Sequence, residues 1–71
     1  MTDLEKVALE NWARMLDAQE LKKEYHNAIN ILVDAYEYHH YFGIPYSEDI
    51  EDRERLLRKV CKERGIHLWE I

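Results

Sequence analysis

Glu37 and His40 are two side chains whose types and spacing could indicate a chemical role. They stand three positions apart, and on a helix this Glu-x-x-His spacing puts a carboxylate and an imidazole on one side, as in the di-iron sites of helical bundles. Such a site also needs carboxylates from facing helices. The chain has no second Glu-x-x-His, and Glu10 or Glu24 would have to be recruited without support from spacing. We therefore predict no metal and no other cofactor, and keep a metal-binding helical bundle as the third hypothesis.

Nucleophilic side chains are few. Ser47 is the only serine and stands where a helix cap is expected, and Cys61 is the only cysteine. Cys61 falls on an apolar stripe, which favours a small core side chain over a reactive thiol. No glycine-rich phosphate loop and no Gly-x-Ser-x-Gly turn is present. We therefore predict no catalytic residues and a protein that is not an enzyme.

Four cations, which we call the basic stripe, share one face of a helix expected over residues 48–64: Arg55, Arg58, Lys59 and Lys62. Such a face attracts nucleic-acid phosphates without regard to sequence, and Trp69 nearby could stack on a base. The net charge of -5 opposes this use, as does the lack of a helix-turn-helix or an extended basic arm. A solvated face is the favoured interpretation, and a weak nucleic-acid-binding regulatory factor is the alternative function.

Residues 35–50, AYEYHHYFGIPYSEDI, hold four tyrosines, one phenylalanine and two adjacent histidines around the only proline. Aromatic rings of this kind are enriched at protein interfaces because they bury a large area at low entropic cost. We predict that a protein binds here. A second copy of the chain is the favoured partner, and a foreign protein of unknown identity is the alternative. The predicted partner-binding residues are Ile31, Ala35, Tyr38, Tyr41, Phe42 and Tyr46.

The helix expected over residues 20–42 has apolar residues on two sides. Its first stripe consists of Leu21, Tyr25, Ile29, Leu32, Val33, Tyr36 and His39, and its second stripe of Ile31, Ala35, Tyr38 and Phe42. Two short helices and a tail would cover one stripe well and both only with difficulty. The alternative is that the other two helices flank this one and cover both stripes within one chain. On the first stripe, His39 is expected to be a hydrogen-bonded interior histidine, whereas the other histidines are expected at the surface.

The first helix is expected over residues 3–17. Thr2 and Glu5 fit a capping box, and apolar residues then recur at helical spacing: Leu4, Ala8, Trp12, Met15 and Leu16. A second capping box from Asp17 to Glu20 precedes the next helix, which Gly43 ends. We predict a break near residues 17–20, although no glycine or proline enforces it, and one bent helix over residues 3–42 is the alternative.

The third helix is expected over residues 48–64, with Ser47 as its N-cap and Gly65 as its C-terminal stop. Its predicted buried stripe consists of Ile50, Leu57, Val60 and Cys61. The tail, residues 66–71, is short and apolar. We expect Ile66, Leu68 and Trp69 to fold back across the helices, and an edge strand that pairs with a second chain is the alternative.

The totals agree with a small helical fold. With 71 residues there is room for one domain, residues 1–71, which buries about 60% of the surface of its unfolded chain. Hydrophobic residues make up 46%, and two glycines and one proline leave few turns, which favours long helices over disorder. We predict an all-α fold, either a small three-helix bundle or a helical hairpin plus a third helix. A signal peptide and a membrane span are both missing, so we expect a cytoplasmic protein without membrane contact.

The charge is unevenly spread along the chain. Residues 26–52 contain six acids and no Lys or Arg, whereas residues 53–71 contain six basic residues and three acids. Acidic helix starts and basic helix ends produce part of this asymmetry, and partner surfaces can produce the rest. Small size without chemical motifs is typical of regulatory or inhibitory proteins such as those that phages and mobile elements encode. We therefore predict a non-enzymatic regulatory or inhibitory protein that acts by protein binding, as a homodimer.

Overall fold

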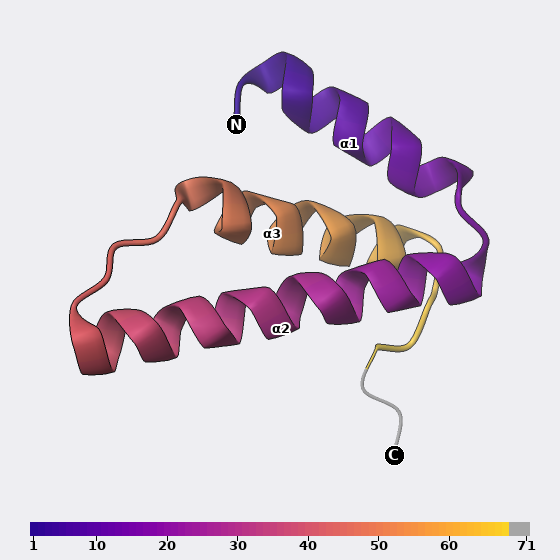
Figure 1. Cartoon of the computed structure of the whole chain (residues 1–71). Coiled ribbons are helices and arrows are strands. Elements are labelled where there is room, and N and C mark those ends of the chain that lie inside the picture. Colours follow the sequence, from indigo (N-terminus) through magenta and orange to yellow (C-terminus); the bar gives the residue numbers. More distant parts are fainter. Residues whose placement is uncertain (69–71) are drawn as a thin grey trace.

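The computed structural model describes residues 1–68 and contains three helices (Figure 1). They are α1 (Asp3–Met15), α2 (Ala18–Phe42) and α3 (Glu48–Glu63). This confirms the all-α prediction, and within residues 1–68 there is no strand. The helix ends lie within two residues of those expected. In the same part of the chain, no helix combines the length and the apolar character needed to cross a membrane.

The chain breaks between α1 and α2 at Leu16 and Asp17. Both residues have extended backbone, with ψ angles of 150° and 166°, and a helix cannot continue through two extended residues. The Asp17 carboxylate accepts the backbone N–H of Glu20 at 2.8 Å, which caps the first turn of α2. A single bent helix is therefore wrong, and a polar cap makes the break without glycine or proline.

Both ends of α3 have the caps that the sequence predicts. The hydroxyl of Ser47 accepts the N–H of Asp49 at 3.1 Å and caps α3. At the other end Gly65 has a φ of 68°, and the N–H of Ile66 reaches back to the carbonyl of Cys61 at 2.9 Å. This is the Schellman arrangement, which needs a left-handed residue, and it turns the tail back toward the helices.

The three helices lie side by side, with α3 in the middle (Figure 1). The Cα atoms span 37 × 35 × 14 Å, so the molecule is flat, much thinner in one direction than in the other two. The expectation that α2 could be the central helix is wrong, because α1 packs on α3 and not across α2. A single layer leaves the outer sides of α1 and α2 without a covering helix.

The core lies where α3 meets its two neighbours. Its buried members are Ala13 from α1, Leu21, Tyr25 and Ala28 from α2, and Leu57, Val60 and Cys61 from α3. Cys61 is fully buried, as predicted for a small core residue, and burial raises the pKa of its thiol. Ile66 and Leu68 pack against this cluster, which confirms that the tail folds back, while the predicted contact of Trp69 lies outside the described residues.

The face of α1 that packs on α3 differs from the one predicted. Leu4 and Met15 of the expected stripe are 79% and 84% exposed. Leu16 is the member of that stripe that packs on the core, together with Leu9 and Ala13, which lie outside it. Apolar residues occur all around α1, so spacing does not select a face. Two ion pairs between α1 and α3 flank the face of α1 that packs on α3. They join Arg14 to Glu63 at 3.2 Å and Lys59 to Glu10 at 3.1 Å.

Arg53 of α3 connects all three helices. Its guanidinium lies 5.7 Å from the ring centroid of Trp12 on α1 and makes a 3.2 Å ion pair with Glu24 on α2. A cation over an indole ring is attracted by the electron density of its face. Trp12 of the predicted stripe therefore contacts α3 through a charged residue at the edge of the core.

Candidate protein-binding surface

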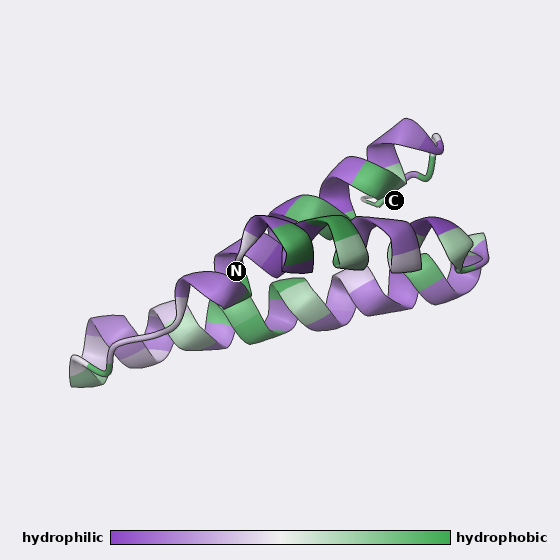
Figure 2. Cartoon of the chain, turned by 90° about the horizontal axis from the view of Figure 1, so that it is seen from above, coloured by the Kyte–Doolittle hydropathy of each residue, from purple (hydrophilic) through white to green (hydrophobic). Residues whose placement is uncertain are grey.

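The second stripe of α2 stays exposed. Ile31, Tyr38 and Phe42 are 52%, 55% and 70% exposed, and Ala35 is half-buried. The buried residues of α2 end at Leu32, and Figure 2 shows the C-terminal end of α2 reaching past α1 and α3 with the connector of residues 43–47 beside it. The alternative in which the other helices cover both stripes is therefore wrong.

A group that we call the tyrosine clamp fixes the connector against α2: Tyr36, His39, Tyr46 and Glu51. The hydroxyls of Tyr36 and Tyr46 both donate to Glu51 Oε1, at 3.2 and 3.1 Å. The ring of Tyr46 meets those of Tyr36 and His39 edge-on, with centroids 5.2 and 5.5 Å apart. Desolvation, together with the Glu51 carboxylate, raises the pKa of Tyr46 to about 12. The clamp holds the connector in place.

The clamp changes the role of two residues singled out in the sequence. His39 is exposed, so the expectation of an interior histidine is wrong, but its Nδ1 lies 3.2 Å from the carbonyl oxygen of Ile44. Tyr46 is half-buried within the clamp, so it contributes a wall to the surface instead of a free ring. Tyr41, in contrast, is 74% exposed beside the second stripe.

An apolar groove runs between α2, the connector and the start of α3. One part has a volume of about 420 Å³ and is lined by Ala35, Tyr38, Ile44, Pro45, Tyr46, Ser47 and Ile50. A second part of about 200 Å³ is lined by Met1, Ala28, Ile31, Asp49, Ile50 and Arg53. Ile50 lines both parts, and the small side chains of Ala28 and Ala35 keep them open. The second stripe therefore borders a hollow that would accept an apolar side chain.

Sequence reasoning missed the residues of this groove that follow α2. Ile44 is about half exposed and Pro45 is exposed next to it, yet the sequence indicated only a stop and a connector there. The missed signal is the pair Tyr46 and Glu51, five residues apart, whose hydrogen bond sets the path of the connector. A polar anchor inside an apolar segment is the feature that could have pointed to it.

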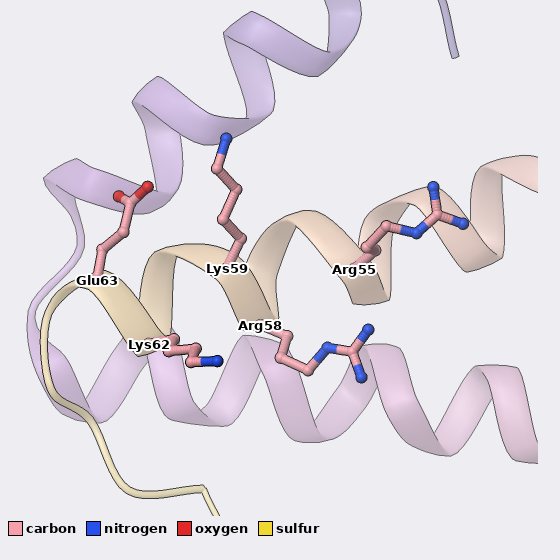
Figure 3. A pocket seen from close by; sticks show the side chains of 5 residues that line it. All are labelled: Arg55, Arg58, Lys59, Lys62 and Glu63. Atoms are coloured by element: carbon pink, nitrogen blue, oxygen red, sulfur yellow. The ribbon is translucent and has the colours of Figure 1, made fainter.

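The basic stripe lies on the exposed side of α3, around a shallow hollow of about 620 Å³ that Glu63 also lines (Figure 3). Lys59 and Glu63 point toward α1, whereas Arg58 and Lys62 lie on the side of α2. The predicted exposure of these cations is confirmed, with Arg58 and Lys59 each 55% exposed.

Most of the positive charge in the basic stripe has an acidic neighbour. Arg55 is paired with Asp52 (3.6 Å), Arg58 with Glu54 (3.5 Å) and Lys59 with Glu10 (3.1 Å). The hydrogen bond from Lys59 also lowers the pKa of the Glu10 carboxyl. Among residues 1–68, Lys62 is the one member without an ion pair. Phosphate binding would therefore have to compete with carboxylates already in place.

We expect no measurable binding of a 20-nucleotide DNA or RNA at physiological salt. Paired cations release few counterions from a nucleic acid, so the electrostatic gain is small. Fluorescence anisotropy of the labelled nucleic acid measures the binding, and Lys59→Glu with Lys62→Glu is the control variant. Binding by the wild type that this variant loses would instead support the nucleic-acid-binding alternative.

Glu37 and His40 are both exposed on α2. In the described part of the chain, no three His, Cys, Asp or Glu side chains come close enough together to hold a metal ion. The spacing that suggested a di-iron half-site thus stands without carboxylates from a facing helix. Glu10 is paired with Lys59, and Glu24 with Arg53.

Comparison with protein families, with curated proteins and with solved structures finds no match to this chain.

Proposed function

We propose that the chain is a non-enzymatic regulatory or inhibitory protein that acts by binding protein through the second stripe of α2, and that it self-associates through this stripe as a homodimer. The exposed rings of Tyr38 and Phe42 beside the apolar groove carry this proposal. Soluble monomers rarely expose contiguous apolar patches of several hundred Å² without a binding role.

The chemistry-bearing side chains support a role in binding over one in catalysis. Ser47 is used as the cap of α3. Cys61 is part of the core, where burial raises its thiol pKa and disfavours the reactive thiolate. Glu54 is buried and accepts the hydroxyl of Tyr25 at 3.0 Å. These groups hold the fold together, and the exposed apolar surface is what remains for a partner.

The two-residue change Tyr38→Ala with Phe42→Ala is expected to turn a dimer into a monomer. Interface rings at the centre of a contact typically contribute 2 kcal/mol or more each, so losing two weakens association by about 1,000-fold. Sedimentation equilibrium at tens of micromolar should give twice the single-chain mass of 8.7 kDa for the wild type and 8.7 kDa for the variant.

The matched control is Leu4→Ala with Met15→Ala, which removes two apolar side chains from α1 that are more exposed than Tyr38 and Phe42. It should leave the mass of the dimer unchanged. Circular dichroism shows whether each variant keeps its helices. A wild-type protein that sediments as a monomer would contradict self-association, and dissociation by the control would move the interface to α1.

A further inference from the structure

We propose that two copies pair along α2 in antiparallel orientation, with the two-fold axis passing midway between Ala35 and Tyr38. This rests on the proposed self-association and adds its register. Along the second stripe the side chains are medium, small, large and large: Ile31, Ala35, Tyr38 and Phe42. About this axis, Ala35 lies opposite the partner's Tyr38, and Ile31 lies opposite the partner's Phe42.

The 4-3-4 spacing of the second stripe is that of alternating core positions in a coiled coil, where a side chain from one helix enters a hole between residues of the other. Ala35 is the hole. It lies in the 420 Å³ part of the apolar groove, whose other walls include Ile44 and Pro45. The partner's Tyr38 would enter this groove, and by symmetry the same contact forms twice.

A parallel pair would fit the same residues poorly. Each residue would then face its own copy, so Ala35 would face alanine and leave a void, while Tyr38 and Phe42 would crowd against identical rings. Voids and overpacking both destabilise a packed interface. Antiparallel helices also place opposite ends of their dipoles side by side. Size and dipole therefore favour the same orientation.

The acidity of this end of α2 does not oppose the pairing. Asp34 and Tyr41 lie on the same flank of the second stripe, both exposed, and antiparallel helices bring equivalent flanks together. At 1.5 Å per residue, Asp34 is offset along the axis by about 3 Å from the partner's Tyr41 and by about 7.5 Å from the partner's Asp34. Each carboxylate thus meets a hydroxyl donor, and Glu37 points away from the contact.

The exposed rings alone supply a large part of the area that a stable dimer buries. With about 200 Å² for an aromatic side chain, the exposed parts of Tyr38, Tyr41 and Phe42 amount to roughly 400 Å². This is half of the roughly 800 Å² that each partner buries in a standard interface. Ile31 and Ile44, each about half exposed, and the walls of the groove add to this area.

Disulfide trapping tests the register. Residues 35 and 35 of the two copies are offset by about 4.5 Å along the axis, and residues 31 and 31 by about 16.5 Å. Under mild oxidation Ala35→Cys should therefore crosslink to itself. Ile31→Cys and Phe42→Cys should not, but an equimolar mixture of the two should give the mixed dimer by mass spectrometry. The wild type, whose Cys61 is buried, and Met15→Cys on α1 measure the background from random collisions.

A size exchange gives a second readout. Ala35→Tyr overpacks the contact and Tyr38→Ala leaves a void, so each should raise the dimer Kd about tenfold or more, while the double variant restores one large and one small side chain and should recover most of the affinity. If the wild type is a dimer, two results would overturn the register. One is that Ile31→Cys crosslinks to itself as readily as the mixture does, and the other is that the double variant recovers no affinity. A monomeric wild type would overturn the proposed function itself.

Discussion

Leu57→Ala is expected to lower the free energy of unfolding by about 2 to 5 kcal/mol, because it removes buried atoms and leaves a cavity that the surroundings fill only in part. Leu57 is fully buried on the central helix, in the cluster that joins α3 to α1 and α2. A chain of this size has a total stability of roughly 4 to 10 kcal/mol. Urea unfolding followed by circular dichroism should show a midpoint far below that of the wild type, or a chain already unfolded.

Leu56→Ala is the matched control, since it removes the same atoms from the neighbouring residue of α3. Leu56 is only partly buried, so the loss should be less than half of that at Leu57. Equal losses would mean that α3 is not held between its neighbours in the way described, and that the layer has a different central helix.

The helix ends could be predicted from the sequence because caps are local. The side chains of Thr2, Asp17 and Ser47 each accept a backbone N–H two or three residues ahead, and Gly43 and Gly65 have the positive φ that ends a helix. None of these contacts depends on the rest of the fold. The number of helices and their order followed from them.

The order of packing could not be predicted in the same way. α3 has few apolar residues, so its stripe gave no reason to place it in the middle. One position of that stripe is filled by Glu54, which is buried and accepts the hydroxyl of Tyr25. From sequence alone a carboxylate is predicted to be exposed, because the hydroxyl that donates to it lies 29 residues earlier in the chain. The face of α1 was missed for a related reason, since its flanking ion pairs reach α3 residues far along the chain.

The candidate surface also has a part that local sequence patterns predict and a part that depends on contacts through space. Exposure of the second stripe follows from local spacing and from the small size of the chain. The groove beside it depends on the path of the connector, which the Tyr46 and Glu51 hydrogen bond fixes through space. Binding at this surface stays a prediction. The five-residue spacing of Tyr46 and Glu51 was the one local signal for the groove.

Tyr25→Phe is expected to lower the free energy of unfolding by about 1.5 to 3 kcal/mol, the range for a hydrogen bond to a charged group. The Tyr25 hydroxyl donates to Glu54 Oε1 at 3.0 Å, and both residues are buried. Burial, and then the Glu54 carboxylate, raise the pKa of Tyr25 to about 12, so the donor keeps its proton at neutral pH. Without this donor, the one contact that Glu54 keeps within residues 1–68 is the longer one to Arg58 at 3.5 Å. Thermal or urea unfolding measures the change.

Two further variants decide whether the buried carboxylate is the cause. Tyr36→Phe removes the same atom from a hydroxyl that also donates to a glutamate, but at an exposed site where Glu51 keeps a second donor in Tyr46. It should cost less than about 1 kcal/mol. Adding Glu54→Met to Tyr25→Phe replaces both partners by apolar groups, which removes the unsatisfied charge and should recover much of the lost stability. If the double variant is less stable than Tyr25→Phe alone, the carboxylate stabilises α3 through its contact with Arg58 and not through the tyrosine.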